Sequence, residues 1–453
     1  MSARPRPAPN GGSRKTPAGL EARQRAVDVL AGVLLRRRPL ETALDEALNE
    51  PATPGHASDA GLTRLIVATT LRRLGQIDDV LGRFLAKPLP QEAGRIRLIL
   101  AGASAQLLFL GTPAHAAIDI AVSQCREEAG LARFGGLVNA VLRKVATQGA
   151  AVIAAQDVAR LNTPDWLLQR WQRAYGLDTT HRIAEAHTSE AALDLTVLGD
   201  PNIWAKRLGG VVLPTGSVRL KSKGRIEALD GFAEGEWWVQ DTAAALPVRL
   251  LGDVAGKRVA DLCAAPGGKT AELAALGAIV TAIDASAKRL KTLTANLERL
   301  RLSAEVIVGD AASWTPSELF DAVLLDAPCL STGTIRRHPD LPYLKKPADL
   351  MVLVELQAKL LDNAARILAP GGTLVYCTCS LEPEEGPEQI AKLLERNNTL
   401  QLRPVRPGES GIAADWVSAE GHLRTLPFHL PMEPTELSGL DGFFAARLTK
   451  ISV

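Results

Sequence analysis

Apolar residues in the first third of the chain recur at steps of three and four, which is the spacing of one helix face. In "LRRLGQIDDVLGRFL", residues 71–85, the apolar positions include Leu71, Leu74, Ile77, Leu81 and Phe84. On a helix these positions form a single stripe. The same pattern continues in "AGRIRLILAGASAQLLFLG" and "GLVNAVLRKVA", with little strand signal between them. The sequence therefore predicts an all-helical domain over residues 20–150.

The pattern changes after the helical segment "PDWLLQRWQRAYG". Three short runs, "LDLTVLGD", "GGVVLP" and "VRLKSKGR", are separated by Gly and Pro and are typical of short strands. They predict a small α+β subdomain, preceded by linker helices, over residues 151–245. In the third run Arg219, Lys221, Lys223 and Arg225 fall at every second position, so on a strand they share one face. Such a face suits the phosphate backbone of a nucleic acid, and it equally suits a solvated sheet edge protected by its charges.

From residue 246 to residue 453 apolar runs alternate with longer helical segments. The runs are "RVADLCA", "AIVTAID", "AEVIVGD", "FDAVLLDAP" and "GTLVYCTCS", and the segments between them are long enough for crossover helices. This alternation is typical of a mostly parallel sheet covered on both faces, a Rossmann-like α/β domain. The last run, "DGFFAARLTK", is expected to add a final strand at one edge.

Composition narrows the class of protein. With 453 residues and 46% apolar content the chain is globular and long enough for several domains. Its 52 basic and 50 acidic residues leave a net charge of +2, so any nucleic-acid surface must be local. Five cysteines are too few for a disulfide framework and favour a reducing compartment.

The N-terminus and the apolar runs bear on localisation. Residues 1–19 are basic and contain no apolar core, so we expect a disordered leader and not a signal peptide. No apolar run reaches the roughly 18 residues of a membrane span. We therefore expect a cytoplasmic protein that makes no membrane contact.

The carboxyl ends of the predicted parallel strands carry reactive and acidic residues. Ligands of open parallel sheets bind beyond these ends. The first strand is followed by "CAAPGGKT", the second and third end in Asp284 and Asp310, the fourth in Asp326 with Cys329 just after it, and the fifth in Cys379. An Asp at one strand end is common, but five such ends meet at one crevice. The sequence predicts a ligand site there.

The loop "DLCAAPGGKT", residues 261–270, has the small residues of a cofactor loop at a strand-to-helix turn. It fits neither the G-x-G-x-x-G pattern of dinucleotide sites nor the spacing of a phosphate loop. Asp284, at the end of the next strand, is placed to bind ribose hydroxyls. S-adenosylmethionine matches this set, because it has an adenosine and an ammonium group but no phosphate.

The stretch "DAPCLSTGTIRRHPD" indicates chemistry on a pyrimidine ring. Enzymes that methylate exocyclic amines have an Asn/Asp-Pro-Pro-aromatic stretch at this place, where this chain has Cys329. Cytosine C5 is a poor nucleophile until a thiolate adds at C6 and turns the ring into an enamine. An acid near N3 and a base for the C5 proton are also needed.

The pair Cys377 and Cys379 in "VYCTCSLEPEE" admits three interpretations. A zinc site needs about four ligands, and no partner Cys or His pair lies nearby, so no metal is expected. On a strand both side chains share a face, but Cys379 lies further toward the crevice and is the expected nucleophile. Cys377 and Cys263 are expected to pack as small apolar residues. A following helix near Pro383 would favour a thiolate, whereas Glu382, Glu384 and Glu385 would oppose it.

The motifs "DLCAAPGGKT", "DAPC…TGTIRRHPD", "TCS" followed by "PEE", and "LDGFFAARL" together closely resemble the RNA 5-methylcytosine methyltransferases of the Nol/Nop/Sun type. "PAHAAIDIAV" and "GLVNAVLRK" are similar to the NusB-like helical domain fused to the bacterial small-subunit rRNA branch of that family. The resemblance implies a NusB-like domain, a small RNA-binding subdomain and a Rossmann-like methyltransferase domain. It implies small-subunit (16S) rRNA as the partner, and a monomer is expected although the sequence does not fix the oligomeric state.

The resemblance also implies residue roles. Cys379 would attack C6, Cys329 would help to release the methylated base, and Asp326 would lie near the cytosine N3 edge. Arg219, Lys221, Lys223, Arg336 and Arg337 are the expected RNA contacts. The residues implied to hold S-adenosylmethionine are Cys263, Ala264, Ala265, Pro266, Gly267, Gly268, Lys269, Asp284, Asp310 and Asp326.

The chain departs from the family pattern at three places. Cys377 stands where the family usually has a small residue or Ser, Gly386 stands where it has Asn, and "LTVLGD" replaces an Arg-Val-Asn run. None of these changes removes a thiol or a cofactor acid, but the last two bear on RNA contact and target choice. Methylation of tRNA, and a non-catalytic RNA-binding assembly factor, remain as alternatives.

Overall fold

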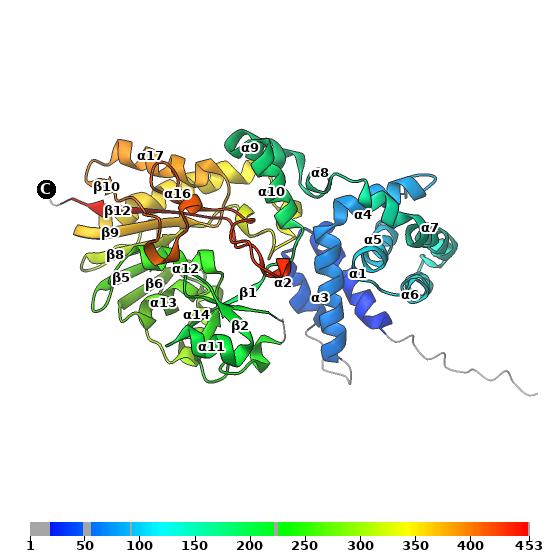
Figure 1. Cartoon of the computed structure of the whole chain (residues 1–453), viewed down its shortest axis with the longest axis horizontal. Helices are drawn as coiled ribbons and strands as arrows, with labels where there is room; N and C mark the ends of the chain where they lie inside the picture. Colours follow the sequence, from blue (N-terminus) through cyan, green and yellow to red (C-terminus); the bar gives the residue numbers. More distant parts are fainter. Residues whose placement is uncertain (1–18, 49–55, 91–92, 222–224, 452–453) are drawn as a thin grey trace, which may run out of the picture. The chain divides into compact units, whose positions relative to one another are not determined.

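The computed structural model describes residues 19–48, 56–90, 93–221 and 225–451. The chain divides into two compact units, with the boundary between Asp157 and Val158. Each unit is described by itself (Figure 1). Residues 1–18 of the predicted leader lie outside the described residues. Within them, no helix has both the length and the apolar character needed to cross a membrane.

The first unit is helical, as predicted. Leu71, Leu74, Ile77 and Leu81 of the predicted stripe are buried, but the stripe spans two helices that meet at Arg73. A later helix of this unit, over residues 94–109, buries nearly every residue from Ile96 to Gln106. The α-helices are α1 (Leu20–Leu34), α2 (Leu40–Leu48), α3 (His56–Arg72), α4 (Leu74–Phe84), α5 (Gly94–Phe109), α6 (Ala114–Glu127) and α7 (Gly135–Ala154).

The second unit begins with three helices, α8 (Val158–Asn162), α9 (Asp165–Tyr175) and α10 (Leu177–His187). A small antiparallel sheet follows in the order β2-β3-β1-β4. Its core includes Leu195, Trp204, Val218 and Trp237. The strand that carries Trp237 was not among the predicted strands. The elements are β1 (Leu193–Val197), α11 (Pro201–Leu208), β2 (Gly210–Val212), β3 (Val218–Leu220) and β4 (Trp237–Val239).

The large sheet has the order β10-β12-β9-β8-β5-β6-β7, with β11 paired to β12. The five strands from β9 to β7 in that order are parallel, which confirms the predicted Rossmann-like arrangement. The strands are β5 (Arg258–Leu262), β6 (Ile279–Asp284), β7 (Glu305–Val308), β8 (Phe320–Asp326), β9 (Leu368–Thr378), β10 (Leu400–Leu402), β11 (Leu423–Thr425) and β12 (Phe443–Lys450).

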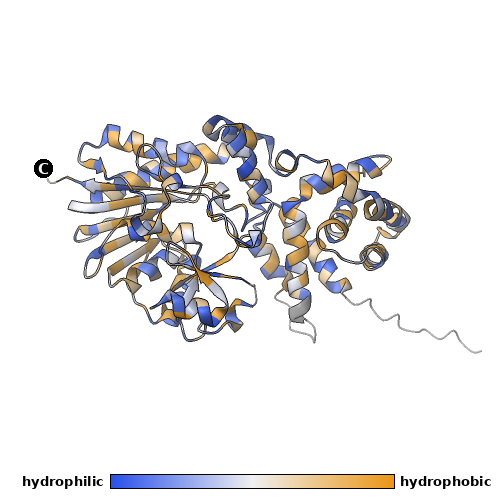
Figure 2. Cartoon of the chain, in the orientation of Figure 1, coloured by the Kyte–Doolittle hydropathy of each residue, from blue (hydrophilic) through white to orange (hydrophobic). Residues whose placement is uncertain are grey.

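Helices cover both faces of the large sheet because its strands bury alternate residues on each side. On β9, Leu374 and Tyr376 pack in the core that includes α16 and α17, and Val375 and Cys377 pack in the core that includes α12. Figure 2 shows mixed hydrophilic and hydrophobic colour along these helices, as expected when one side is buried. The helices are α12 (Thr242–Leu250), α13 (Gly268–Ala275), α14 (Ala287–Leu300), α15 (Leu341–Leu344), α16 (Pro347–Ile367) and α17 (Pro387–Arg396).

The prediction that "DGFFAARLTK" forms an edge strand is wrong. This strand, β12, lies between β9 and β10 and is antiparallel to both. Its residues from Phe443 to Leu448 are buried, so a covered, inner position suits them better than an edge. The pairing places Phe444 opposite Thr378, the residue before Cys379.

Candidate active site

Two thiols meet at the carboxyl edge of the parallel strands. The Sγ atoms of Cys329, which follows β8, and Cys379, which follows β9, are 3.6 Å apart. Cys329 is only 8% exposed, whereas Cys379 is half-buried. The hydrogen bond with Cys379, together with burial, raises the pKa of the Cys329 thiol well above its ordinary value. Cys329 therefore keeps its proton at neutral pH, and Cys379 is the more accessible sulfur.

A glycine joins the two thiol-bearing segments. The Gly333 N–H donates to the Cys379 carbonyl at 2.9 Å, and the Gly442 N–H donates to the Gly333 carbonyl at 2.9 Å. A Cβ atom at Gly333 would lie 1.9 Å from the Gly442 carbonyl oxygen. Only glycine permits this approach, so the turn after Cys329 is held against both Cys379 and the start of β12.

Lys269 and Asp326 form an ion pair beside a third thiol, that of Cys377. The Lys269 Nζ lies 2.7 Å from Asp326 Oδ2, and the Cys377 thiol donates to Asp326 Oδ1 at 3.6 Å. Burial alone would lower the pKa of Lys269, but the Asp326 carboxylate, Cys377 and Asp261 together raise it. Lys269 is therefore a fixed cation. The Asp326 side chain remains 33% exposed and accessible to a ligand.

The loop between β5 and α13 has the close backbone packing that the sequence predicted. Gly267 has a φ of 103°, and a Cβ there would lie 2.7 Å from Leu293 Cγ. The Asp284 carboxylate accepts from the Ala265 N–H at 3.2 Å and the Ser286 N–H at 2.9 Å. Asp284 thus holds this loop from the carboxyl end of β6.

Asp310 lies beyond β7, the outermost parallel strand. Its carboxylate accepts from the Ala312 N–H at 3.0 Å and from the Ser313 hydroxyl at 2.9 Å. The residue is exposed. It therefore lies at the same sheet edge as Asp284 but at its solvent side.

The sequence analysis missed Asp261, the last residue but one of β5. It is fully buried, and the Thr270 hydroxyl donates to its Oδ2 at 2.6 Å. Its Oδ1 has no hydrogen-bond partner among the described residues. Burial raises the pKa of Asp261 to about 7. The signal was present as the first letter of "DLCAAPGGKT", but the apolar run around it indicated only a strand.

Two of the three acidic residues expected to oppose a thiolate at Cys379 are paired with residues of α9. Arg170 on α9 pairs with both Glu382 and Glu384, and the Trp171 indole N–H donates to Glu382 at 3.0 Å. Glu382 is completely buried. Positive charge from α9 therefore offsets two of the carboxylates expected to oppose a thiolate. The α-helix itself starts only at Pro387, after a short 3-10 turn.

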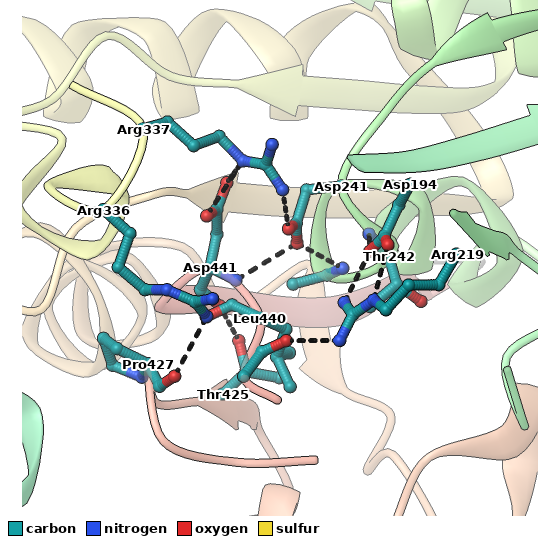
Figure 3. Close-up of polar contacts among 12 residues, drawn as sticks. Asp194, Arg219, Asp241, Thr242, Arg336, Arg337, Thr425, Pro427, Leu440 and Asp441 are labelled. Atoms are coloured by element: carbon teal, nitrogen blue, oxygen red, sulfur yellow. Dashed lines mark hydrogen bonds and ion pairs between the residues drawn. The ribbon is translucent and has the colours of Figure 1, made fainter. Parts of the chain in front are cut away.

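Two of the predicted RNA contacts are wrong. Arg219 is 1% exposed and lies 2.6 Å from Asp194 of β1, its register partner in the small sheet. Arg336 is 2% exposed, and its guanidinium donates to backbone carbonyls that include those of Pro427 and Ser438. Both guanidinium groups point into the protein (Figure 3). Neither is available to a phosphate.

Arg337, Lys221 and Lys223 differ from these two. Arg337 bridges the carboxylates of Asp241 and Asp441, so its charge is already compensated within the network of Figure 3. Lys221 is exposed and stays a predicted RNA contact. Lys223 lies outside the described residues. The predicted basic face is thus not continuous, because β3 ends at Leu220.

The described part of the chain contains free thiols and no clustered metal ligands. There, no three His, Cys, Asp or Glu side chains are grouped so as to hold a metal ion. All five cysteines are free thiols, and Cys377 is buried in the sheet core.

Comparison with known proteins identifies the family. Residues 20–147 match the NusB family, and residues 248–449 match the family described as 16S rRNA methyltransferase RsmB/F. The chain is 35% identical over 449 residues to ribosomal RNA small subunit methyltransferase B of Vibrio cholerae, covering 95% of this chain and 98% of the relative. It is 36% identical to the protein of that name from Klebsiella pneumoniae, covering 86% and 90%.

Solved structures share the fold. The crystal structure of PH0851 superimposes with a TM-score of 0.72 at 24% identity and covers 96% of this chain and 100% of that one. A methyltransferase homolog from Pyrococcus horikoshii has a TM-score of 0.54 at 28% identity and covers 65% of this chain and 98% of its own. With the paired thiols, the glycine loop and the extended match to its relatives, the chain belongs to the RsmB/F family of 16S rRNA methyltransferases.

Proposed function

We propose that the protein methylates C5 of a cytosine in small-subunit rRNA, with S-adenosylmethionine as methyl donor and through a covalent cysteine adduct. The observation that carries this proposal is the pair of thiols 3.6 Å apart at the carboxyl edge of the sheet. Family membership supports rRNA as the substrate. The Lys269–Asp326 pair at the carboxyl end of β8 supports a charged, hydrogen-bonding environment for a base.

The residues at the strand ends suit S-adenosylmethionine. Their side chains are mainly carboxylates, and the Asp261 carboxylate has a buried oxygen without a hydrogen-bond partner among the described residues. Acceptors of this kind suit an ammonium group and ribose hydroxyls, and no phosphate loop is present. When bound, S-adenosylmethionine supplies an electrophilic methyl group. The residues proposed to hold it are residues 263–269 with Asp261, Asp284, Asp310 and Asp326.

The proposed reaction begins at Cys379. Its thiolate forms a bond to cytosine C6, and the π electrons of the C5–C6 bond move to C5, which takes the methyl group as the methyl–sulfur bond of the donor breaks and leaves a neutral thioether. Asp326, whose carboxylate is held by Lys269, is proposed to accept a hydrogen bond from the cytosine N4 amino group at the N3 edge. A base removes the C5 proton, the pair of electrons re-forms the C5–C6 double bond, and the Cys379 thiolate leaves. Cys329 is proposed to assist this last step.

RNA contact is proposed for the small four-stranded sheet and its surroundings. Lys221 is an exposed cation at the end of β3, and cations of this kind contact phosphates without reading sequence. The target base must be unpaired or turned out of a helix to reach the thiols.

Bisulfite mapping of small-subunit rRNA from cells with and without the gene tests the function. We expect one 5-methylcytosine to disappear on deletion and to return with the wild-type gene but not with Cys379→Ala. Loss of a tRNA 5-methylcytosine instead would reassign the substrate. If both maps are unchanged and calorimetry detects no S-adenosylmethionine binding, the enzyme proposal fails and an assembly factor is indicated.

A further inference from the structure

The backbone on each side of Cys329 is held by a buried side chain. The Gln357 side-chain amide of α16 donates to the Pro328 carbonyl at 2.8 Å. On the other side, the Leu330 N–H donates to both carboxylate oxygens of Glu385, at 3.0 and 3.1 Å. The two residues that flank Cys329 are therefore fixed by one glutamine and one glutamate.

These two side chains also bond each other. Gln357 Nε2 lies 3.0 Å from Glu385 Oε1, and Gln389 donates to Gln357 Oε1 at 3.2 Å and to the Val354 carbonyl at 2.8 Å. Gln357 and Glu385 are 0% exposed, and Gln389 is 1% exposed. Burial and this order of donors leave the Gln357 amide one orientation, with its nitrogen toward Pro328 and Glu385.

Glu385 reaches the strand of the second thiol as well. Its backbone carbonyl accepts from the Tyr376 hydroxyl at 2.8 Å and from the Thr378 hydroxyl at 3.1 Å. Thr378 is the residue before Cys379. Glu385 thus spans the Cys329 turn with its carboxylate and the end of β9 with its carbonyl.

A buried carboxylate is costly unless it is well bonded. The bonds to Glu385 named above come from an amide N–H and a side-chain amide, and burial raises the pKa of its carboxyl group. A glutamine is nearly isosteric and would avoid the buried charge. It would also replace one acceptor oxygen by an NH₂ group. That group would face the Leu330 N–H and the Gln357 side-chain amide, which are both donors.

We infer that Glu385 is a positioning residue for Cys329, and that with Gln357 it sets the Cys329 thiol against Cys379 for release of the methylated base. This inference rests on the proposed function. It assigns a role in the second half of the reaction to a residue that touches neither the base nor the cofactor.

The test measures methyl transfer and release separately. Each enzyme is mixed in excess with small-subunit rRNA transcribed in vitro and radiolabelled S-adenosylmethionine. Methyl transfer is followed in a single turnover, and the covalent protein–RNA complex is followed on a denaturing gel. The enzymes are wild type, Cys329→Ala, Glu385→Gln and Gln357→Glu. The matched control is Glu388→Gln, the same substitution at an exposed residue that pairs with Lys392 on the protein surface.

We expect Glu385→Gln to release RNA roughly tenfold or more slowly than wild type, because a small displacement of a reacting group has effects of this size. Its first methyl transfer should stay within about threefold of wild type. Gln357→Glu, which turns a carboxylate toward the Pro328 carbonyl, should show the same split. Cys329→Ala should trap the most complex, and Glu388→Gln should resemble wild type.

The outcomes separate the inference from the proposed function. If Cys329→Ala traps complex while Glu385→Gln and Gln357→Glu release RNA at the wild-type rate, the inference is overturned. It is also overturned if both variants lose methyl transfer and release together while keeping wild-type melting temperature and S-adenosylmethionine affinity. If Cys329→Ala itself traps no complex, the proposed role of Cys329 fails.

Discussion

At the scale of single residues, two cysteines of the same chemistry receive different surroundings. Cys329 is enclosed and shares a hydrogen bond with the other sulfur, and its raised pKa keeps it protonated. Cys379 is the more accessible of the two. This difference in enclosure, and not the identity of the side chain, supports assigning attack to Cys379 and proton transfer during release to Cys329.

Cys379→Ser should abolish methylation. A serine hydroxyl at this site is far less nucleophilic than a thiolate, so we expect single-turnover methylation of small-subunit rRNA below roughly one-thousandth of wild type. No covalent complex should form. Cys125→Ala, at a buried cysteine of the helical unit, is the control and should methylate normally. A Cys379→Ser enzyme with wild-type activity would rule out the proposed nucleophile.

Asp261 should make stability depend on pH. Its pKa in the folded protein, about 7, is raised by burial above the ordinary value of 3.8. The folded state therefore holds this proton more tightly than the unfolded state does. The resulting stabilisation is present below about pH 4 and is lost as the pH rises to about 7.

The substitution Asp261→Asn removes this titration while keeping an acceptor for Thr270. We expect the free energy of unfolding of the variant, relative to wild type, to rise by roughly 2–3 kcal/mol between pH 5 and pH 8. Urea unfolding at the two pH values measures it. S-adenosylmethionine affinity should fall in the same variant. An identical pH dependence in both proteins would show that Asp261 does not titrate in this range.

At the scale of elements, loops that follow three separate strands are tied into one site. The turn after β8 contacts the end of β9 and the residue before β12 through Gly333. The ion-pair network of Figure 3 extends these ties to β1, β3 and the start of α12. The site is therefore assembled by contacts between loops, on a frame set by the sheet.

Gly333→Ala should disrupt this assembly. The added methyl group would overlap the Gly442 carbonyl, so one of the two turns must move. We expect a loss of about 1–3 kcal/mol in the free energy of unfolding and at least a tenfold loss of methylation. Gly136→Ala in α7 is the control, because its Cβ would meet open space and alanine favours helix. Equal behaviour of the two variants would contradict the packing described here.

Most of the strands and the residues at their ends were predictable from the sequence, and the exceptions have physical causes. Strand ends were located correctly because strands β5, β6, β8 and β9 are long apolar runs with acids or thiols after them. Arg219 was placed wrongly because alternation shows that charges share a face but not that the face is buried. The charge of the buried Arg219 is compensated by Asp194, 25 residues away in sequence. The inner position of β12 was also not predictable, because hydrophobic periodicity identifies a strand but not its neighbours in the sheet.

At the scale of the whole molecule, the proposed cofactor site and the two thiols belong to one of the two units. All residues proposed to hold S-adenosylmethionine, and both reactive thiols, belong to residues 158–453. The contacts described for them also lie within that unit.

A fragment of residues 158–453 should therefore fold and bind S-adenosylmethionine within about threefold of the affinity of the full chain, since domains with their own core fold alone. Isothermal titration calorimetry measures the affinity, and circular dichroism checks the fold. The fragment carrying Asp261→Asn is the control and should bind more weakly. A well-folded fragment without detectable binding would show that the cofactor site needs residues 1–157.

The inner position of β12 has a consequence for synthesis. Every residue proposed to react or to bind the cofactor precedes Ser380, whereas the strand that flanks β9, and the Gly442 that supports the Cys329 turn, are translated after all of them. A strand cannot pair before it has left the ribosome. In a nascent chain without β12, the two thiols therefore lie beside an incomplete sheet. Chains that still lack residues 442–448 should thus be catalytically silent, so that methylation requires this strand to have been translated and paired.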